Sequence, residues 1–433
     1  MYISAALKEA GFRTLILDAN VLPEDELERS ARKFSPGLSI VNTATPTFGA
    51  DLEFSGKLKK MGSLVALVGV HPTALHKEVS EDSRVDFIVR GEPEETSREL
   101  ALALFSGKGL SKVKGLSWKK ESGKAVHNKE RPFINNLDSL PWPDREGVDN
   151  SRYKMPFSGE PFAIINPSRG CPYSCTFCTA SVFYGKSFRK RSPGSVCNEI
   201  SECVSKYGIR TFLFWSDEFT LDRKFVLALC GEIRKRGLGI KWFANSRIDT
   251  CDPELFREMR RAGCFLVSFG IESSDQRILD LARKGTSVSR AKSAVLAAKG
   301  AGIETIGHFI FGLVGETEKS ARGTIRFSKE LGLDYAQFYI ATPYPGTPFH
   351  EYCSEKGLIT ERNYSKMEIS NAAIRQGNLS AQDLLRIRRT AYREFYSRPL
   401  FALKKGIEVL SKGGLLGARS AFRYLSDWGE LGK

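Results

Sequence analysis

The 433-residue sequence lacks any apolar run long enough for a transmembrane helix, and its first residues do not follow the pattern of a signal peptide. We therefore expect an intracellular, cytoplasmic protein. Internal repeats and low-complexity tracts are also absent from the sequence. Because the length exceeds what one hydrophobic core usually supports, we expect two or three domains.

A disulfide framework is not indicated either. The nine cysteines are odd in number and irregularly spaced along a long chain. Three of them lie within "SRGCPYSCTFCTA", and none precedes Cys171. The other six are interpreted as small buried hydrophobic residues: they are Cys197, Cys203, Cys230, Cys251, Cys264 and Cys353.

Acidic residues are fewer than basic ones, 50 against 65, which gives a formal charge of +15. This excess favours an anionic partner, such as nucleic acid, an anionic membrane surface or a phosphorylated substrate. A merely solubilising surface is the alternative. Basic strips with interleaved aromatic residues, the usual nucleic-acid footprint, are not evident outside the C-terminal tail, so nucleic acid is not the partner we expect.

The first part of the chain, residues 1–130, alternates between helix-like and strand-like segments. We expect a helix over 2–11, a buried strand over 13–19, and further strands over 37–45, 63–70 and 85–91. Short strands around a turn are expected over 110–128. This alternation predicts a Rossmann-like, flavodoxin-like α/β domain with ligand loops at the strand ends. Residues 131–157, rich in Pro, Asp and Asn, are predicted to be a linker.

A second alternation fills residues 158–357, where strands separated by helix-length spacers predict a partial βα barrel of the TIM type. The six strands are expected within 162–170, 209–219, 240–249, 264–273, 303–313 and 333–347. The active site of such a barrel lies at the carboxyl ends of its strands. Residues 358–433 are predicted to be helical and basic. The tail from 381 onward would lie on an anionic membrane or close the mouth of the barrel.

The cysteine cluster has the spacing C-x3-C-x2-C, formed by Cys171, Cys175 and Cys178. A structural zinc site needs four ligands, and no nearby His or Cys supplies a fourth. Three thiolates around a cubic iron–sulfur cluster would leave one iron open to a substrate or cofactor. Three purely structural thiols are the alternative, although packing alone would not need this spacing.

This loop resembles the hallmark of the radical S-adenosylmethionine (SAM) superfamily. The resemblance implies a [4Fe-4S] cluster on the three cysteines, with the fourth iron chelating SAM. Reductive cleavage of SAM would then give methionine and a 5′-deoxyadenosyl radical that abstracts hydrogen from the substrate. The electron would come from a donor such as flavodoxin or ferredoxin.

The same resemblance implies a set of SAM contacts at successive strand ends. Phe177 lies between the last two cysteines, and "FWSDEFT" resembles the segment that contacts the methionyl amine. Arg247 in "ANSRID" is a candidate partner for the carboxylate, since a guanidinium fork suits that geometry. "FGIESSDQRIL" resembles a later strand-end pattern. For Arg247 and Glu272 the alternative is an ion pair between adjacent strands. The candidate contacts are Phe177, Ser216, Asp217, Glu218, Arg247, Glu272 and Ser273.

The N-terminal part, with "LVGVHPTALHKEV" and "VDFIVRGEPEET", resembles the cobalamin (B12)-binding domain of a large branch of this superfamily. The implied contacts are Gly69, His71, Thr73, Gly91 and Glu92. The two glycines leave room for a flat ring. The Asp-x-His-x-x-Gly motif is missing, so His71 and His76 are not placed as axial ligands, and a loop histidine that bonds backbone is the alternative for His71. The strand expected before residue 2 is also missing, so the domain either begins further upstream or does not hold cobalamin.

The sequence thus predicts a transferase, a cobalamin-binding radical SAM enzyme that modifies an unactivated carbon by methyl transfer. The same scaffold would support cyclisation or rearrangement, with or without cobalamin. A nucleic-acid methylthiotransferase is disfavoured because that class carries three further cysteines in its N-terminal domain. A non-catalytic iron–sulfur protein would leave Arg247 and Glu272 without a role. Small-molecule, lipid or tetrapyrrole substrates are all compatible with the resemblance.

Overall fold

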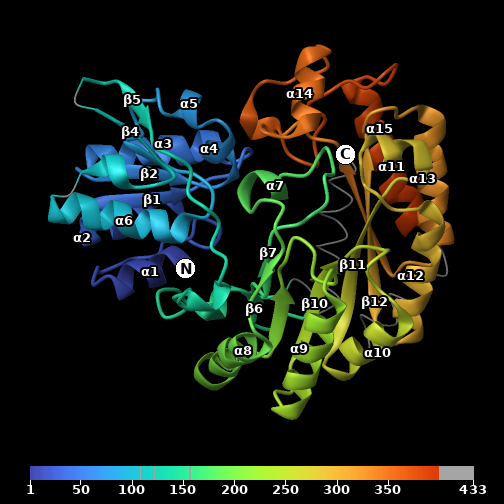
Figure 1. Ribbon diagram of the computed structural model, residues 1–433. Helices are drawn as coiled ribbons and strands as arrows, with labels where there is room; N and C mark the ends of the chain where they lie inside the picture. Colours follow the sequence, from blue (N-terminus) through green and yellow to red (C-terminus); the bar gives the residue numbers. More distant parts are fainter. Residues whose placement is uncertain (108, 121, 156–157, 399–433) are drawn as a thin grey trace.

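The computed structural model describes residues 1–398 except 108, 121 and 156–157. The part of the predicted basic tail that follows residue 398 lies outside the described residues. Figure 1 shows two α/β units side by side, the N-terminal one in blue and the second in green to red. The α/β fold class and the order of the two units agree with the sequence-based prediction.

The N-terminal sheet is mixed, with parallel strands first and an antiparallel ribbon last. Its strands are paired in sequence order, and β1 and β5 form the edges. The parallel strands are β1 (Leu38–Asn42), β2 (Leu64–Val68) and β3 (Phe87–Val89), and the antiparallel ones are β4 (Leu116–Lys119) and β5 (Ala125–His127).

Helices cover both faces of this sheet. They are α1 (Tyr2–Glu9), α2 (Glu24–Phe34), α3 (Phe48–Lys60), α4 (Val70–Ala74), α5 (His76–Val79) and α6 (Pro93–Ser106). One apolar core joins Val65 and Leu67 of β2 to α2 and α3, and the other joins Ala66 and Val68 to α6. Successive β2 side chains thus enter opposite cores, as a strand buried on both faces requires.

The predicted strand over 13–19 is wrong: these residues join no sheet, and Leu15 is 43% exposed. A strand is stable only when its backbone groups pair with a neighbour. The first paired strand is β1, which forms the edge of the sheet, and no strand of the described residues lies beyond it. The apolar composition of 13–19 therefore favoured a strand that has no pairing partner.

The second sheet has six parallel strands in sequential order, and all six predicted strands are confirmed. It is open between β6 and β13. Its strands are β6 (Phe162–Ile165), β9 (Thr211–Phe214), β10 (Lys241–Ser246), β11 (Cys264–Glu272), β12 (Glu304–Phe311) and β13 (Tyr335–Ile340). A short antiparallel ribbon, β7 (Ser168–Arg169) with β8 (Arg189–Lys190), encloses the cysteine loop and α7 (Ala180–Phe183).

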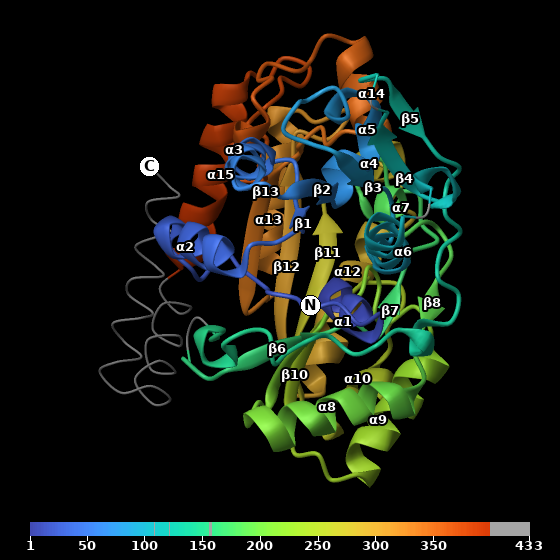
Figure 2. The same ribbon diagram turned by 90° about the vertical axis from the view of Figure 1, so that its left-hand side faces the viewer.

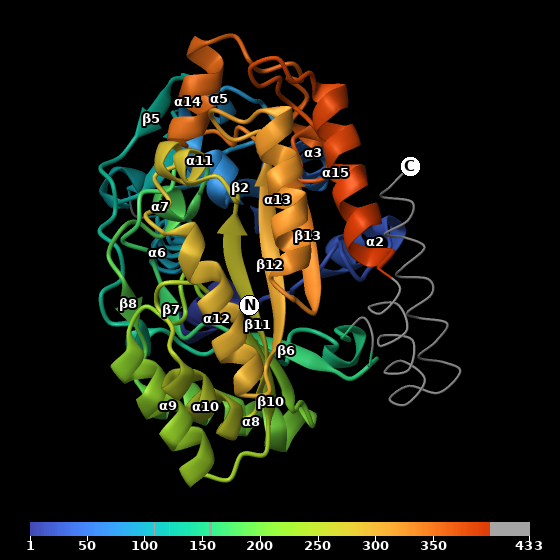
Figure 3. The same ribbon diagram turned by 90° about the vertical axis from the view of Figure 1, so that its right-hand side faces the viewer.

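Helices cover the outer face of the sheet, on the side away from the N-terminal unit, whereas α14 (Pro348–Glu355) lies at the carboxyl ends of the strands, beside that unit (Figure 3). The covering helices are α8 (Pro193–Tyr207), α9 (Arg223–Lys235), α10 (Pro253–Arg261), α11 (Gln276–Leu281), α12 (Val288–Gly300), α13 (Glu318–Glu330) and α15 (Ala381–Tyr396). The described residues also form four 3-10 helices: η1 (Leu110–Lys112), η2 (Leu137–Ser139), η3 (Asn150–Arg152) and η4 (Tyr364–Lys366).

The two faces of the parallel sheet differ in burial. Side chains alternate along β10, β12 and β13 between buried and half-buried positions. Trp242, Phe309 and Phe338 point into the main core beneath the helices. The other set points to the inner face, which is turned toward the N-terminal unit (Figures 1 and 2). The inner face is therefore the accessible side of this sheet.

Helix α15 covers the edge strand β13. Its apolar residues Leu384 and Phe395 are buried in the main core. The Tyr396 hydroxyl accepts from the Ala336 amide at 3.1 Å, the Tyr392 hydroxyl accepts from the Phe338 amide at 3.2 Å, and the Arg388 guanidinium donates to the Phe338 carbonyl at 2.9 Å. These contacts satisfy strand groups that an uncovered edge would expose. This part of the tail thus packs on the sheet. Within the described residues, no helix combines the length and apolarity needed to cross a membrane.

Candidate functional site

The cysteine loop begins just after β7 and is fixed on three sides. The Cys171 amide donates to the Gly185 carbonyl at 3.3 Å. In the middle of the loop, the Thr176 amide donates to the Ala282 carbonyl at 2.9 Å, and the Thr176 carbonyl accepts from the Phe349 amide at 3.0 Å. Phe177 packs against the main core. The loop therefore holds its three thiols at the carboxyl ends of the parallel strands.

The three thiols are free, half-buried and electrostatically coupled. Burial raises the pKa of Cys171 to about 11, with contributions from Glu218, Cys178 and Cys175. Each thiolate of a cubic iron–sulfur cluster binds a different iron. A donor set of three cysteine thiols on one loop therefore fits a cluster with three protein ligands.

The acidic segment after β9 contacts the same loop. The Asp217 carboxylate accepts from the Gly170 amide at 2.7 Å, directly before Cys171, and Ser216 accepts from the Ser168 hydroxyl at 2.9 Å. Burial raises the pKa values of Asp217 and Glu218. Glu218 accepts from the hydroxyls of Thr220 and Thr250, and from the backbone amide of Arg247. The predicted residues 216–218 thus lie together beside the cysteines.

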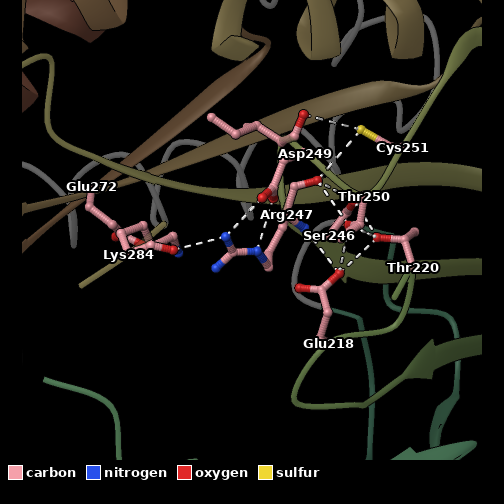
Figure 4. A network of polar contacts seen from close by, with 10 residues as sticks. Glu218, Thr220, Ser246, Arg247, Asp249, Thr250, Cys251, Glu272 and Lys284 are labelled. Carbon is pink, nitrogen blue, oxygen red and sulfur yellow. Dashed lines mark hydrogen bonds and ion pairs between the residues drawn. The ribbon is translucent and has the colours of Figure 1, made fainter. Parts of the chain in front are cut away.

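Arg247 is buried at the end of β10 and forms a fork with Asp249 (Figure 4). Its Nε donates to Asp249 at 2.9 Å, and one terminal nitrogen donates to the other carboxylate oxygen at 3.0 Å and to the Lys284 carbonyl at 2.8 Å. The guanidinium carbon lies 3.5 Å from the centroid of the Tyr173 ring, which belongs to the cysteine loop. Stacking and the fork together orient this side chain beside the thiols.

Glu272 ends β11 in a left-handed conformation, with φ of 66°, at an irregularity in the ladder to β12. Its carboxylate accepts from the Lys284 ammonium at 2.7 Å, and both side chains are buried. Ser273 is fully buried, and its hydroxyl accepts from the Asp275 amide at 3.1 Å. Maintaining a non-glycine residue at positive φ costs free energy, which is typical of functional sites.

The alternative of an Arg247–Glu272 ion pair is wrong, because each residue has a different partner. Arg247 pairs with Asp249, and Glu272 pairs with Lys284. Tyr173, Asp249 and Lys284 also belong to this site and were not predicted from the sequence. Tyr173 lies inside the cysteine motif and Asp249 two residues after Arg247, so proximity in sequence is a signal for both. For Lys284, at the end of a helical spacer, the sequence offers no comparable signal.

The loops at the carboxyl ends of β2 and β3 bring together the residues that resemble a B12 site. The Thr73 hydroxyl donates to the Gly69 carbonyl at 2.6 Å and accepts from the Gly91 amide at 3.1 Å. A Cβ at Gly69 would lie 2.2 Å from the Thr43 carbonyl oxygen, whereas a Cβ at Gly91 would meet nothing within 4 Å. Position 69 therefore requires glycine because the Thr43 backbone passes too close for a side chain. Gly91, in contrast, leaves the open space that a flat ring needs.

The His71 side chain is buried and is not exposed at this edge of the sheet. It is 1% exposed, and its ring lies between Phe48, at 4.2 Å between centroids, and Tyr364, at 4.6 Å. Nδ1 lies 3.1 Å from the Thr45 hydroxyl, while buried Nε2 has no hydrogen-bond partner within the described residues. Burial lowers the pKa of His71 to about 4, so the imidazole is neutral at neutral pH.

This histidine should make the protein less stable in mild acid. Because its pKa is lower in the folded state than the ordinary value of 6.5, protonation favours unfolding, and stability falls as the pH decreases from 6.5 towards 4. At pH 5 we expect a loss of about 2 kcal/mol relative to pH 7. Thermal melting of wild type and His71→Gln between pH 7 and 5 measures this. If the two proteins lose stability in parallel, the assignment to His71 is wrong.

Glu92 connects the two units through a buried charge network. Its carboxylate accepts from Arg169 at 3.0 Å, from Arg189 at 2.7 Å and from the Ile134 amide at 2.7 Å. Arg169 also donates to Glu94 at 2.6 Å. All four charged side chains are at most 4% exposed. The Glu92 side chain is therefore committed to this interface, and Arg169 stands two residues before Cys171.

The carboxyl edges of the two sheets face each other. A Cβ at Gly346, in the loop before α14, would lie 3.0 Å from Cβ of Ala74 in α4 and 3.3 Å from Val182 in α7. Loops that follow β2, the cysteines and β13 thus meet at one place. The arrangement defines a two-domain enzyme in which a three-thiolate cluster site faces a ligand-binding Rossmann-like edge.

Comparisons with known proteins identify both domains. The radical SAM superfamily profile matches residues 165–328, and the B12-binding domain profile matches residues 1–101. An uncharacterized methyltransferase of Pyrococcus horikoshii is 35% identical over 390 residues, which cover 89% of this chain and 84% of the relative. The anaerobic magnesium-protoporphyrin IX monomethyl ester cyclase of Cereibacter sphaeroides is 30% identical over 451 residues, covering 100% of this chain and 73% of the cyclase.

Solved structures have the same fold. The radical SAM methyltransferase TsrM from Kitasatospora setae, solved with cobalamin and a [4Fe-4S] cluster, matches with a TM-score of 0.71 and 21% identity, covering 82% of this chain and 74% of TsrM. The cobalamin-dependent radical enzyme OxsB matches with a TM-score of 0.76 and 16% identity, covering 100% of this chain and 68% of OxsB.

The chain belongs to the radical SAM superfamily and carries an N-terminal B12-binding domain. It is a cobalamin-dependent radical SAM enzyme, and its cofactors are a [4Fe-4S] cluster, SAM and cobalamin.

Proposed function

We propose that this enzyme transfers a methyl group from SAM to an unactivated carbon of its substrate. The observation that carries the proposal is the meeting of the two edges, where the backbone at Gly346 lies so close to Ala74 of the B12-binding domain and Val182 beside the cysteines that an added Cβ would crowd both. When bound, the cluster and SAM supply a 5′-deoxyadenosyl radical, and cobalamin supplies the methyl group. The 35% identity to a methyltransferase over most of the chain supports the same reaction.

The contacts around the cysteine loop support the proposed cluster and SAM sites. Cys171, Cys175 and Cys178 bind three irons. SAM takes the space beside them, next to Phe177, Ser216, Asp217, Glu218, Arg247, Glu272 and Ser273. Tyr173 and Asp249 hold Arg247 in place, and its positive charge would attract the carboxylate of SAM. Ser273 acts through its backbone, because its hydroxyl is fully buried and is bonded to the Asp275 amide and the Thr324 hydroxyl.

The cobalamin site is formed by Gly69, His71, Thr73, Gly91 and Glu92. Gly91 provides the open space, and Thr73 holds its loop to that of Gly69. The ring of His71 is neutral and buried, and it supports the loop after β2 by packing. Glu92 participates through its backbone, since Arg169 and Arg189 occupy its carboxylate.

The domain limits in this proposal are 1–130 for the B12-binding domain, 131–157 for the linker, 158–357 for the radical SAM domain and 358–433 for the helical, basic C-terminal region. The first is a flavodoxin-like sheet without its first strand, and the sequential parallel sheet is a partial βα barrel. The linker is packed rather than loose, since Asp144 bonds Ser4 and Lys8, and buried Arg145 bonds Glu199.

The substrate is a small molecule, lipid or tetrapyrrole, and the electron donor is of the flavodoxin or ferredoxin type. Relatives include a bacteriochlorophyllide methyltransferase of Chlorobaculum tepidum and a hopanoid methylase of Methylococcus capsulatus, at 30% and 23% identity. Peripheral membrane contact in the cytoplasm would rest on residues 399–433, because the apolar face of α15 is buried against the sheet. Cyclisation is the second candidate, since the cyclase of Cereibacter sphaeroides aligns with 100% of this chain.

The test is anaerobic reconstitution of the full chain with iron, sulfide and hydroxocobalamin, followed by removal of free ligand. We expect about four irons and about one cobalt per chain. With a reductant and methyl-deuterated SAM, methyl transfer to cobalamin predicts S-adenosylhomocysteine in addition to 5′-deoxyadenosine. Retained cobalt without S-adenosylhomocysteine would favour the cyclase, and failure to retain cobalt would contradict the B12 assignment.

A matched pair of glycine variants locates the cobalamin site. Gly91 and Gly107 have nearly the same positive φ, 70° and 71°, and neither would crowd an added Cβ. Gly91→Leu should reduce bound cobalt at least tenfold, because the side chain fills the space for the ring. Gly107→Leu, at the far end of α6, imposes similar backbone strain and should leave cobalt content unchanged. Equal losses would mean that Gly91 serves only the fold.

A further inference from the structure

The inner face of the parallel sheet has an ordered set of side chains that the cofactor sites do not use. The ladders place Ile164, Leu213 and Phe243 in one row. Asn245, Ser268 and Ile306 form the next row toward the carboxyl ends. Trp215 and Ile164 are 49% and 44% exposed, unlike the aromatic residues of the outer face. Exposed aromatic and aliphatic groups on a concave enzyme face are typical of a ligand site.

One further row joins this face to the Glu272–Lys284 pair. Gly270 lies in register with His308, and His308 with Gln337. A Cβ at Gly270 would lie 2.6 Å from the Glu272 carboxylate and 2.7 Å from the Lys284 ammonium. Gly270 therefore makes room for the ion pair over the sheet, and His308 is the next side chain beside it.

His308 is the first member of a hydrogen-bonded chain along this row. The Tyr339 hydroxyl donates to the Gln337 side-chain oxygen, and His308 Nδ1 lies 3.0 Å from the Tyr339 oxygen. We assign the tautomer in which Nδ1–H donates to the Tyr339 oxygen, because the phenolic hydrogen is directed to Gln337. Nε2 of the neutral ring is then an acceptor, and it makes no hydrogen bond within the described residues. Burial lowers the pKa of His308 to about 4, which agrees with a neutral ring.

The charges on this face lie outside these rows. Lys241 and Glu304 are at the amino ends of β10 and β12, opposite the cysteines. At the carboxyl ends, Glu272 and Lys284 neutralise each other. Between them, the described inner-face residues of the strands carry no ionised side chain. A phosphate or carboxylate placed there would lose its hydration without gaining a cationic partner.

We propose that this inner face binds the substrate, and that the substrate is an electrically neutral, largely apolar molecule whose hydroxyl or N–H group donates a hydrogen bond to His308 Nε2. The inference rests on the proposed function, since it names the substrate class of the same site. His308 is the residue that selects the donor, and Tyr339 and Gln337 are positioning residues that fix its tautomer. Phe243, Ile306 and Trp215 contact the apolar body.

Three naphthalene probes test this with the reconstituted full-length enzyme. 2-Naphthol carries a neutral donor, 2-methoxynaphthalene lacks the donor, and 2-naphthoate carries a negative charge on the same ring system. Equilibrium dialysis measures their affinities. We expect 2-naphthol to bind about tenfold more tightly than each of the others, the value of one hydrogen bond to an otherwise unpaired acceptor.

Variants of His308 and of the residues beside it test whether His308 causes the preference for 2-naphthol. His308→Phe should reduce the ratio of 2-naphthol to 2-methoxynaphthalene affinity to about one, whereas His308→Gln, which keeps an acceptor, should restore part of it. Tyr339→Phe should weaken the preference because it frees the tautomer. Tyr207→Phe, the same change at the end of α8, should leave it unchanged. A merely structural role for His308 would alter both affinities together.

Any of three results would overturn the inference. In the wild type these are 2-naphthoate binding as tightly as 2-naphthol, or no preference for 2-naphthol over 2-methoxynaphthalene. The third is an unchanged preference in His308→Phe. Release of 5′-deoxyadenosine, measured in the same preparations, separates this failure from that of the proposed function. An enzyme that cleaves SAM but lacks the preference contradicts only the substrate class, whereas an enzyme without cobalt or SAM cleavage contradicts the proposed function.

Discussion

Replacement of Cys175 by alanine should abolish SAM cleavage, with at least a thousandfold loss of 5′-deoxyadenosine formation. Removing one of three thiolates leaves a second iron of the cluster without a protein ligand, so the cluster is no longer held with a single open position. Cys175 is the middle of the three cysteines in the loop, and its side chain is half-buried. Iron content and the visible spectrum after reconstitution, followed by product analysis, measure the effect.

Cys230→Ala is the matched control for this experiment. Cys230 lies in α9, is 1% exposed and packs in the main core, away from the cysteine loop. Its replacement by a residue with high helix propensity should cost little stability and leave iron content and product formation at wild-type levels. If Cys175→Ala keeps a full cluster and full activity, the cluster assignment is wrong. Equal losses in both variants would attribute the effect to misfolding.

Arg169→Met should destabilise the protein by about 3 to 5 kcal/mol, because it leaves Glu92 and Glu94 partly or wholly unpaired in a buried interface. Arg169 is 3% exposed and donates to both carboxylates, and its guanidinium lies over the rings of Tyr2 and Tyr184. Denaturant unfolding and limited proteolysis of the linker measure the loss. Breaking this contact between the units should make the linker accessible to protease.

The double variant Arg169→Met with Glu94→Gln should recover part of this stability, because it removes one of the uncompensated charges together with the cation. Arg322→Met is the surface control. Arg322 pairs with Glu318 on the exposed side of α13, and loss of such a pair costs about 0.5 kcal/mol or less. If Arg169→Met is no more destabilising than Arg322→Met, the buried network contributes nothing to the stability of the two-domain structure.

The sequence was sufficient where the determinant is local. The six strands of the parallel sheet are short apolar or alternating runs, and each carries its own periodicity. The cysteine spacing is equally local. The segment 13–19 has a strand-like composition too, but pairing depends on a neighbour that composition does not reveal. A β-strand forms only when its backbone pairs with a second segment, and the local sequence describes only one of the two segments.

The polar partners could not be predicted for a related reason. Arg169 and Glu92 are 77 residues apart, and the fold alone brings them into contact. Lys284 and Glu272 are closer in sequence, yet only the irregular end of β11 and the open backbone at Gly270 let their side chains meet. Residues that surround a site are thus recoverable from a motif, whereas the residues that hold those side chains in place depend on tertiary geometry.

The buried network of Arg169, Arg189, Glu92 and Glu94 also limits how this protein can be recombined. A chimera that joins its B12-binding domain to the radical SAM domain of a relative would place two carboxylates against a foreign surface. Such a hybrid needs both arginines transplanted with the domain, or both acids neutralised. Expression of either half alone would likewise expose an unpaired set of like charges to water. The two domains are separate folds along the chain, but they are not interchangeable modules.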